Sequence, residues 1–210
     1  MEVNILMIKN VIFDLGSVLI NNDPSEYIKS LGFSEEKTKA LNQALSSDST
    51  WHDKDMGIYE SYRDCIPIFQ RNHSEFTEEI AMFFQDGWMG KIYRPIEENM
   101  VLYEKAKELG YPIYLLTNYS IDGFAYLEAS YDFIREIHGK IVSSHVHLCK
   151  PDRKIYELLL DKYDLKASEC IFFDDNSENV SAAKELGIQA VLFKDIEEAV
   201  KMLEQSQKQF

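Results

Sequence analysis

NVIFDLG, residues 10–16, is the stretch that decides the fold of this 210-residue chain. Its apolar residues 11–13 are followed at once by Asp14 and Gly16. A short apolar run that stops at an acid and a glycine predicts a buried strand opening into a loop. Asp14 is therefore expected at the carboxyl end of a strand.

Two later apolar runs end in the same way. Residues 112–116 lead to Thr117, and residues 170–173 lead to Asp174. Weaker strand patterns occupy residues 140–143 and 189–193. From residue 93 onward such strands alternate with helical patterns, which indicates a parallel sheet with helices on both faces. We predict an α/β protein with a Rossmann-like three-layer core and a mainly parallel sheet.

The segment between the first strand and residue 95 breaks this alternation, because its patterns are mostly helical. The predicted helices cover residues 25–31, 34–45, 59–70 and 76–86. We therefore predict an α/β core domain made of residues 1–20 and 96–210, and an inserted helical cap domain made of residues 21–95.

The composition limits the possible partners. The chain has 22 Lys and Arg against 36 Asp and Glu, a formal net charge of −14, and 45% hydrophobic residues. The apolar content supports a packed core, whereas the negative charge repels nucleic acid and anionic lipid. No stretch approaches the roughly 20 apolar residues of a membrane span. We expect neither a nucleic acid nor a membrane as partner, and the oligomeric state is left open.

The three cysteines, Cys65, Cys149 and Cys170, are odd in number, widely spaced and without a CxxC pair. This pattern is typical of reduced thiols, so we expect a cytoplasmic location.

The polar residues after the strands point to one site, since ligands of an open parallel sheet bind at the carboxyl ends of its strands. Asp14, Thr117 and the pair Asp174-Asp175 all stand at such ends. Lys150 lies in a loop just before a predicted helix. Each could have a simpler role, as a helix cap, a turn former or a solvated lysine, but their order along the chain favours a shared site.

These residue types suit phosphoryl transfer. A carboxylate such as Asp14 can attack phosphorus, and Mg²⁺ takes carboxylate and carbonyl oxygens as ligands. A lysine neutralises phosphoryl oxygens as a point charge. The backbone N–H groups of Leu15 and Gly16 could bind the anion, since a glycine allows close approach.

Four motifs of the chain resemble those of the haloacid dehalogenase superfamily, in the same order. They are FDLGSVLI at 13–20, LLTNYS at 115–120, CKPDRKIY at 149–156 and FFDDNSEN at 172–179. WHDKDMG at 51–57, DGW at 86–88 and RP at 94–95 further resemble the cap region of the bacterial α-D-glucose-1-phosphate phosphatase group. The resemblance covers nearly the whole chain.

The resemblance implies a role for each motif residue. Asp14 is implied as the nucleophile and as a metal ligand, with the Gly16 carbonyl as a second ligand. Thr117 and Asn118 are implied to hold the phosphoryl group, which Lys150 neutralises while orienting Asp14.

The last motif supplies acids for a magnesium ion. The resemblance implies that Asp175 is the metal-binding acid, with Asp174 as its neighbour in the metal site. Asn179 stands where many relatives have a further outer acid.

One position departs from the pattern of most phosphatases in the superfamily. They carry a second aspartate two residues after the nucleophile, as acid and base, and this chain has Gly16 there. General acid–base catalysis contributes about 10²–10⁴-fold. The glucose-1-phosphate phosphatase group shares the glycine, and an anomeric phosphate leaves easily. We hypothesise that Asp23, or a cap residue such as His52 or Asp53, supplies the proton.

The sequence therefore predicts a magnesium-dependent phosphatase that forms an aspartyl-phosphate on Asp14. Its expected substrate is a small phosphorylated metabolite, a sugar phosphate such as α-glucose-1-phosphate. One alternative is a metal-free haloacid dehalogenase-type hydrolase, against which the pair Asp174-Asp175 argues. The other is a catalytically weak phosphate-binding or regulatory protein, for which Gly16 is the support.

Overall fold

The sheet at the centre of the molecule has five strands, all paired in parallel. The computed structural model describes residues 8–207. The strand order is β5 (Gly139–Val142), β4 (Ile113–Thr117), β1 (Asn10–Phe13), β6 (Cys170–Asp174) and β7 (Gln189–Leu192). The predicted α/β fold with a parallel sheet is confirmed, and β1 lies in the middle.

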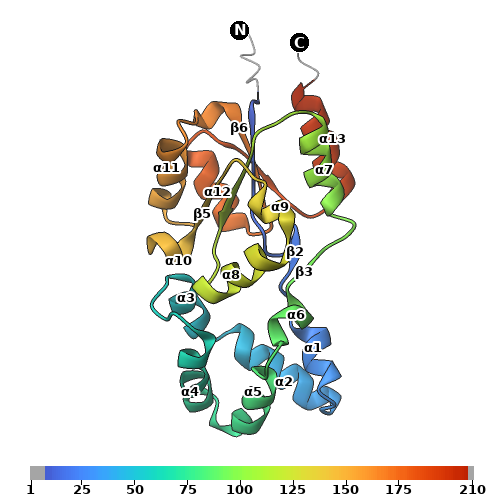
Figure 1. Ribbon diagram of the computed structural model, residues 1–210, viewed down its shortest axis with the longest axis vertical. Helices are drawn as coiled ribbons and strands as arrows, with labels where there is room; N and C mark the ends of the chain where they lie inside the picture. Colours follow the sequence, from blue (N-terminus) through green and yellow to red (C-terminus); the bar gives the residue numbers. More distant parts are fainter. Residues whose placement is uncertain (1–7, 208–210) are drawn as a thin grey trace.

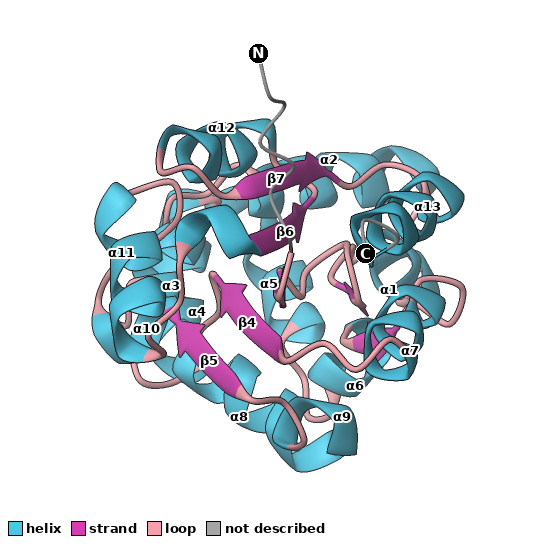
Figure 2. Ribbon diagram, turned by 90° about the horizontal axis from the view of Figure 1, so that it is seen from above, coloured by secondary structure: helices cyan, strands magenta, loops and turns pink. Residues whose placement is uncertain are grey.

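Alternating side chains of the strands pack against helices on opposite faces. Ile12 and Phe172 belong to the cluster formed with α11 (Arg153–Lys162) and α12 (Ser177–Glu185). Phe13 belongs to the cluster on the other face, and its ring stacks on Phe173. That face is covered by α7 (Met100–Glu108), α8 (Ile121–Ser130) and α13 (Ile196–Gln207), as Figure 2 shows. Three layers result, as predicted.

Shorter helices complete this part of the chain. They are α9 (Asp132–Arg135), α10 (Ser143–Val146) and the 3₁₀ helix η2 (Ala167–Glu169). The α10 helix follows β5 directly, at the carboxyl edge of the sheet.

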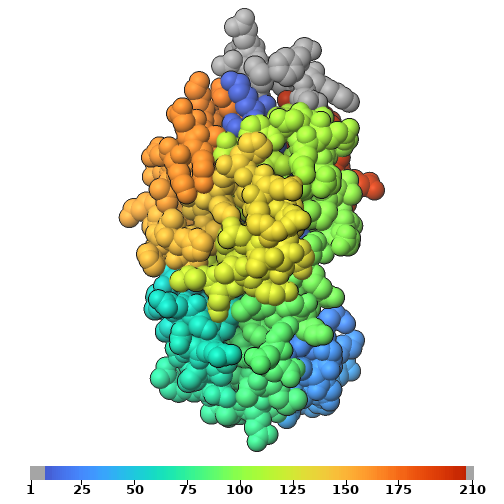
Figure 3. Space-filling view, in the orientation of Figure 1, coloured from blue at the N-terminus to red at the C-terminus, as the bar shows by residue number. Residues whose placement is uncertain are grey.

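The inserted segment, residues 22–93, forms a helical lobe below the sheet (Figures 1 and 3). Its helices are α1 (Ser25–Ser30), α2 (Glu35–Ser46), α3 (Thr50–Asp55), α4 (Tyr62–Asn72), η1 (Ser74–Phe76), α5 (Thr77–Phe83) and α6 (Trp88–Ile92). The chain enters and leaves it through β2 (Ile20–Asn21) and β3 (Arg94–Pro95), which pair antiparallel.

Several of these elements differ from the sequence pattern. The helix predicted from residue 59 begins at Tyr62, because Ser61 and Asp64 form a capping box there. The α3 helix lies between two of the predicted helices, and near its start Asp48 Oδ1 accepts from Thr50 N at 2.8 Å. The short β2–β3 pair has too few residues to leave a periodic pattern.

Candidate active site

Asp14 is a buried carboxylate at the end of β1, between β4 and β6. Its Oδ1 atom accepts from Thr117 Oγ1 at 2.8 Å and from Leu15 N at 2.7 Å. Lys150 Nζ lies 3.0 Å from the same oxygen. No hydrogen bond to Oδ2 is found among residues 8–207, so the geometry leaves this oxygen free to react.

Lys150 lies between two carboxylates and is almost fully buried. Its Nζ is 3.0 Å from Asp14 Oδ1 and 2.6 Å from Asp174 Oδ2. Burial works against the charged lysine, but Asp14 and Asp174 outweigh it and raise its pKa. The lysine is therefore a fixed positive charge beside the proposed nucleophile.

The side chain of Asn118 holds the loop that carries Lys150. Lys150 N donates to Asn118 Oδ1 at 2.9 Å, and Asn118 Nδ2 donates to the Lys150 carbonyl at 3.0 Å. The amide is thus engaged with protein backbone, which leaves the N–H of the main chain as the group of Asn118 that can face a phosphoryl oxygen. Lys150 is followed by a cis peptide bond to Pro151.

Three carboxylates gather beside the lysine. Each of Asp14, Asp174 and Asp175 has a carboxylate oxygen that lies within 4.8 Å of a carboxylate oxygen of the other two. Asp174 is fully buried, and Asn179 Nδ2 donates to both its oxygens at 3.0 and 3.1 Å. Asp175 is exposed. Asp174 is therefore engaged in holding Lys150, whereas Asp14 and Asp175 have oxygens open to a cation.

When its carboxylates are ionised, this cluster carries more negative charge than Lys150 neutralises. Burial raises the pKa of Asp14 to about 6; Asp174 adds to the rise and Lys150 opposes it. Burial and the charge of Asp174 also raise the pKa of Asp175. One lysine faces three carboxylates, and all the available ligands are hard oxygens, so the donor set fits Mg²⁺.

Gly16 occupies the place of the usual acid–base residue, and the neighbouring side chain of Asn22 fills the space. A Cβ atom built on Gly16 would lie 2.7 Å from Asn22 Nδ2. Asn22 is held in turn, because Ser17 Oγ donates to Asn22 Oδ1 at 2.9 Å. The position has no room for a side chain without a shift of Asn22.

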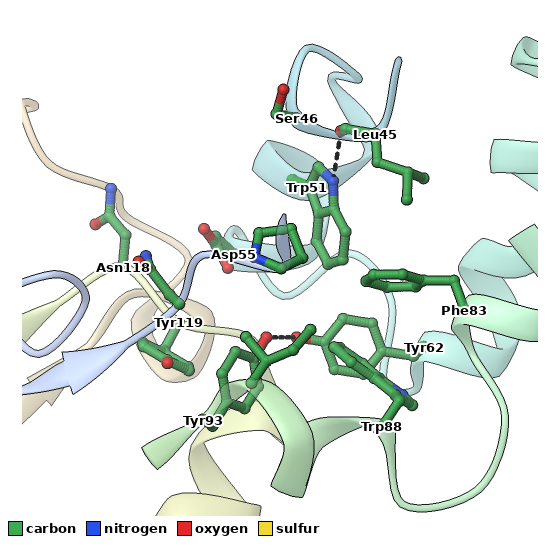
Figure 4. Close-up of a pocket in the computed structure, with 13 residues that line it drawn as sticks. Leu45, Ser46, Trp51, Asp55, Tyr62, Phe83, Trp88, Tyr93, Asn118 and Tyr119 are labelled. Carbon is green, nitrogen blue, oxygen red and sulfur yellow. Dashed lines mark hydrogen bonds between the residues drawn. The ribbon is translucent and has the colours of Figure 1, made fainter. Parts of the chain in front are cut away.

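A pocket of about 240 Å³ lies between the strand ends and the inserted segment (Figure 4). Most of its wall is aromatic. The lining includes Trp51, Tyr62, Phe83, Trp88, Tyr93 and Tyr119, together with Asn22, Ser46, Asp55 and Asn118. The side chains of Tyr62 and Tyr93 meet through their hydroxyls at 2.9 Å. The pocket therefore offers apolar surface with a few polar groups.

Of the residues hypothesised to replace the missing acid, none lines this pocket. Asp23 Oδ1 accepts from Ser25 N at 2.9 Å and from its hydroxyl at 2.6 Å, so it caps α1. His52 is exposed. The acid in the wall is Asp55, which the sequence analysis did not single out.

Two further findings bear on the sequence predictions. The three cysteines are free and buried. Within residues 8–207 there is no helix long and apolar enough to cross a membrane.

Comparison with known proteins agrees with this geometry. Residues 8–187 match the family model for haloacid dehalogenase-like hydrolases. The chain belongs to this family of hydrolases, and the prediction of an enzyme is confirmed.

Two curated relatives carry phosphatase names. The sesquiterpene phosphatase of Aspergillus oryzae is 29% identical over 86% of this chain and 87% of its own length. The enolase-phosphatase E1 of Aquifex aeolicus is 25% identical over 75% of this chain and 65% of its own length. These names agree with the prediction of a phosphohydrolase.

Solved structures share the fold. A HAD family enzyme of Bacteroides thetaiotaomicron, in complex with magnesium and inorganic phosphate, is 22% identical with a TM-score of 0.63, covering 89% of this chain and 94% of its own. A predicted HAD-like hydrolase of Porphyromonas gingivalis is 18% identical with a TM-score of 0.65, covering 97% of this chain and 100% of its own. The glucose-1-phosphate phosphatase subgroup stays a prediction.

Proposed function

We propose that the protein is a magnesium-dependent phosphatase in which Asp14 Oδ2 attacks the phosphorus of a small phosphomonoester. The observation that carries this proposal is the asymmetric setting of Asp14. Three donors hold Oδ1, and Oδ2 has none among residues 8–207. The attack forms an aspartyl-phosphate, which water then hydrolyses.

The surrounding residues bind and neutralise the phosphoryl group in this proposal. Lys150 supplies a positive charge, and the N–H groups of Gly16 and Asn118 are available to phosphoryl oxygens. Asp14, Asp175 and the Gly16 carbonyl would hold Mg²⁺, with Asp174 nearby. The ion, when bound, neutralises negative charge on the phosphoryl group. Asp174 keeps Lys150 in place through its 2.6 Å ion pair.

The pocket wall bears on the substrate class. A sugar phosphate such as α-glucose-1-phosphate fits the proposed chemistry, since aromatic rings such as Trp51 and Trp88 can stack on the apolar faces of a sugar. The aromatic lining also favours a second candidate, a phosphomonoester with a compact apolar group. The sesquiterpene phosphatase relative supports this second candidate.

The alternatives agree less well with the charges of the site. A metal-free dehalogenase has no need of a cluster of three carboxylates, which is what surrounds Lys150. A phosphate-binding protein without catalysis does not need the free Oδ2 of Asp14. Reduced cysteines and a small phosphorylated metabolite as partner favour a cytoplasmic enzyme of metabolism.

The decisive experiment is a phosphate-release assay over sugar phosphates, alkyl phosphates and p-nitrophenyl phosphate, with and without Mg²⁺. We expect turnover that EDTA abolishes and Mg²⁺ restores. Asp14→Asn should lower kcat by about 10⁴-fold or more. Asp161→Asn, an exposed acid on α11, is the matched control and should behave as wild type. Equal phosphate release by Asp14→Asn would overturn the proposal.

A further inference from the structure

Asp55, the last residue of α3, is the one carboxylate among the residues that line the pocket. It stands in the same wall as Asn118 and Tyr119, which follow Thr117 at the end of β4. Thr117 in turn contacts Asp14 at 2.8 Å. The inserted segment thus brings a carboxylate into the same pocket wall as Asn118 (Figure 4), and the charge of this carboxylate interacts with that of Asp14.

The backbone of Asp55 is fixed to the core by direct contacts. Ser143 Oγ donates to the Asp55 carbonyl at 2.6 Å, and it accepts from Tyr119 N at 3.0 Å. One hydroxyl at the carboxyl edge of the sheet therefore links the acid to the strand-end loop. A residue held in this way is placed by the fold and not by a mobile loop.

The turn after Asp55 is pressed against α10. A Cβ atom on Gly57 would lie 2.4 Å from the Ser144 carbonyl, and the φ of Gly57 is 74°. His147 Nδ1 donates to the Met56 carbonyl at 2.9 Å. Glycine is needed at this position both for its backbone conformation and for the close approach.

The neighbouring Lys54 forms its ion pair with Asp122 and not with Asp55. Lys54 Nζ lies 2.7 Å from Asp122 Oδ1 and 4.5 Å from the centre of the Tyr62 ring. Within residues 8–207 no hydrogen bond to the carboxylate of Asp55 is found. Asp55 is half-buried, so its carboxylate oxygens, which accept no hydrogen bond from these residues, are open to a ligand in the pocket.

Burial raises the pKa of Asp55 to about 7, and the charge of Asp14 adds to the rise, while Lys54 and Lys150 oppose it. The titratable groups that face it are Asp14, Lys54, Lys150, Tyr62, Tyr93, Tyr119 and Cys149. The phenols and the thiol have raised pKa values and are neutral near pH 7. Both forms of Asp55 are therefore accessible near neutral pH, which suits acid–base catalysis.

We propose that Asp55 is the catalytic acid and base of the reaction, in place of the residue that Gly16 lacks. This inference rests on the proposed phosphatase function. As Asp14 Oδ2 bonds to phosphorus and the ester P–O bond breaks, protonated Asp55 gives its proton to the leaving oxygen, which departs as an alcohol. The resulting Asp55 carboxylate takes a proton from water as that water attacks phosphorus and the Asp14–phosphorus bond breaks. Each turnover restores both carboxyl groups and releases one alcohol and one phosphate.

The test is Asp55→Asn assayed with leaving groups of different strength. Alkyl phosphates need a proton on the departing oxygen, so their kcat/KM should fall by about 10²–10⁴-fold. With p-nitrophenyl phosphate, whose phenolate leaves unaided, the variant should show a first-turnover burst within about 10-fold of the wild-type rate. Steady-state turnover should then be slow, because in this variant no carboxylate at position 55 takes a proton from the water that hydrolyses the aspartyl-phosphate.

Asp53→Asn on the same helix is the matched control, since Asp53 is outside the pocket lining. It should retain both activities, and circular dichroism with thermal unfolding should show that each variant folds. Asp55→Glu should recover part of the alkyl phosphate activity with a shifted pH profile. An Asp55→Asn variant that hydrolyses alkyl phosphates at the wild-type rate, or loses burst and alkyl turnover equally, would overturn the inference. Activity retained by Asp14→Asn would instead overturn the proposed function itself.

Discussion

Two lysines are nearly inaccessible among residues 8–207, and they lie in two different regions of the molecule. Lys150, at the strand ends, touches two buried carboxylates, Asp14 and Asp174. Lys54, in the inserted segment, touches Asp122 of α8, whose side chain is 24% exposed. The two contacts of Lys150 hold the carboxylates at the strand ends, whereas the contact of Lys54 joins the pocket wall to the core. The position of Asp14 at the strand ends and the attachment of the pocket wall thus depend on separate ion pairs.

The largest effect is expected from Lys150→Met. It leaves Asp14 and Asp174 as unpaired buried carboxylates, so unfolding free energy should fall by about 3–5 kcal/mol at pH 8. The loss should be smaller at pH 5, because the pKa of Asp14 is about 6 with the lysine present, and protonation then removes its charge. Urea denaturation of the variant and the wild type at both pH values measures this loss of unfolding free energy.

Lys54→Met is the matched variant for this comparison. Asp122 can be hydrated once its partner is gone, so the expected cost is only about 1–2 kcal/mol. Similar losses for the two lysine variants would show that the two regions do not differ in the way proposed.

Gly57→Ala should have the next largest effect. The substitution combines a positive φ with a Cβ that would approach the Ser144 carbonyl to 2.4 Å, so we expect a cost of about 2–3 kcal/mol. Phosphatase activity should fall as well, because Asp55 would move away from the strand ends. Thermal unfolding and kcat for an alkyl phosphate are the measurements. Gly32→Ala is the control, because Gly32 has a φ of 83° but no atom within 4 Å of its added Cβ. Its loss of stability therefore measures the backbone strain without the close contact.

The strand ends and the inserted segment also differ in how well their functional residues could be predicted from the sequence. Asp14, Thr117 and Asp174 each follow an apolar run, so their convergence at the sheet edge could be predicted from strand periodicity. The role of Asp55 could not, because it depends on a hydrogen bond with Ser143, which lies 88 positions away. Nor could the sequence show that the Asn118 amide is engaged by the Lys150 backbone, since that contact forms only after folding.

The α3 helix illustrates the same limit. Its residues are polar and lack an apolar stripe, so local pattern favours a loop. The helix is stabilised by the hydrogen bond from Thr50 N to Asp48, whose carboxylate is held by Asn72 and His73, and by the Lys54–Asp122 pair. The contacts with Asn72, His73 and Asp122 form only in the folded chain. The motifs therefore indicated the proposed nucleophile but not the acid in the pocket wall.

Asp55→Asn should increase stability while lowering activity. The folded-state pKa of Asp55 is about 7 against an ordinary value of 3.8, so folding favours the protonated form. Its favourable contribution is complete below pH 4 and is lost as the pH rises through 7. The neutral asparagine avoids this loss, so we expect a gain on the order of 2 kcal/mol at pH 8 and none at pH 4. Asp53→Asn should show no gain, and a variant less stable than wild type at pH 8 would contradict the argument.

The smallest effect tests whether the inserted segment selects the organic part of the substrate. Trp51 lines the pocket, and its Nε1 donates to the Leu45 carbonyl at 2.7 Å. Trp51→Phe should cost about 1 kcal/mol of stability through this lost hydrogen bond. The KM for the preferred substrate should rise several-fold, whereas the inhibition constant of orthovanadate should stay the same, because Lys150 and the strand-end N–H groups bind the phosphoryl group. Phe133→Leu, on the core and away from the pocket, controls for a general loss of packing. If the affinity for orthovanadate falls together with that for the substrate, the two regions are not separable, and the pocket wall acts on the phosphoryl group as well.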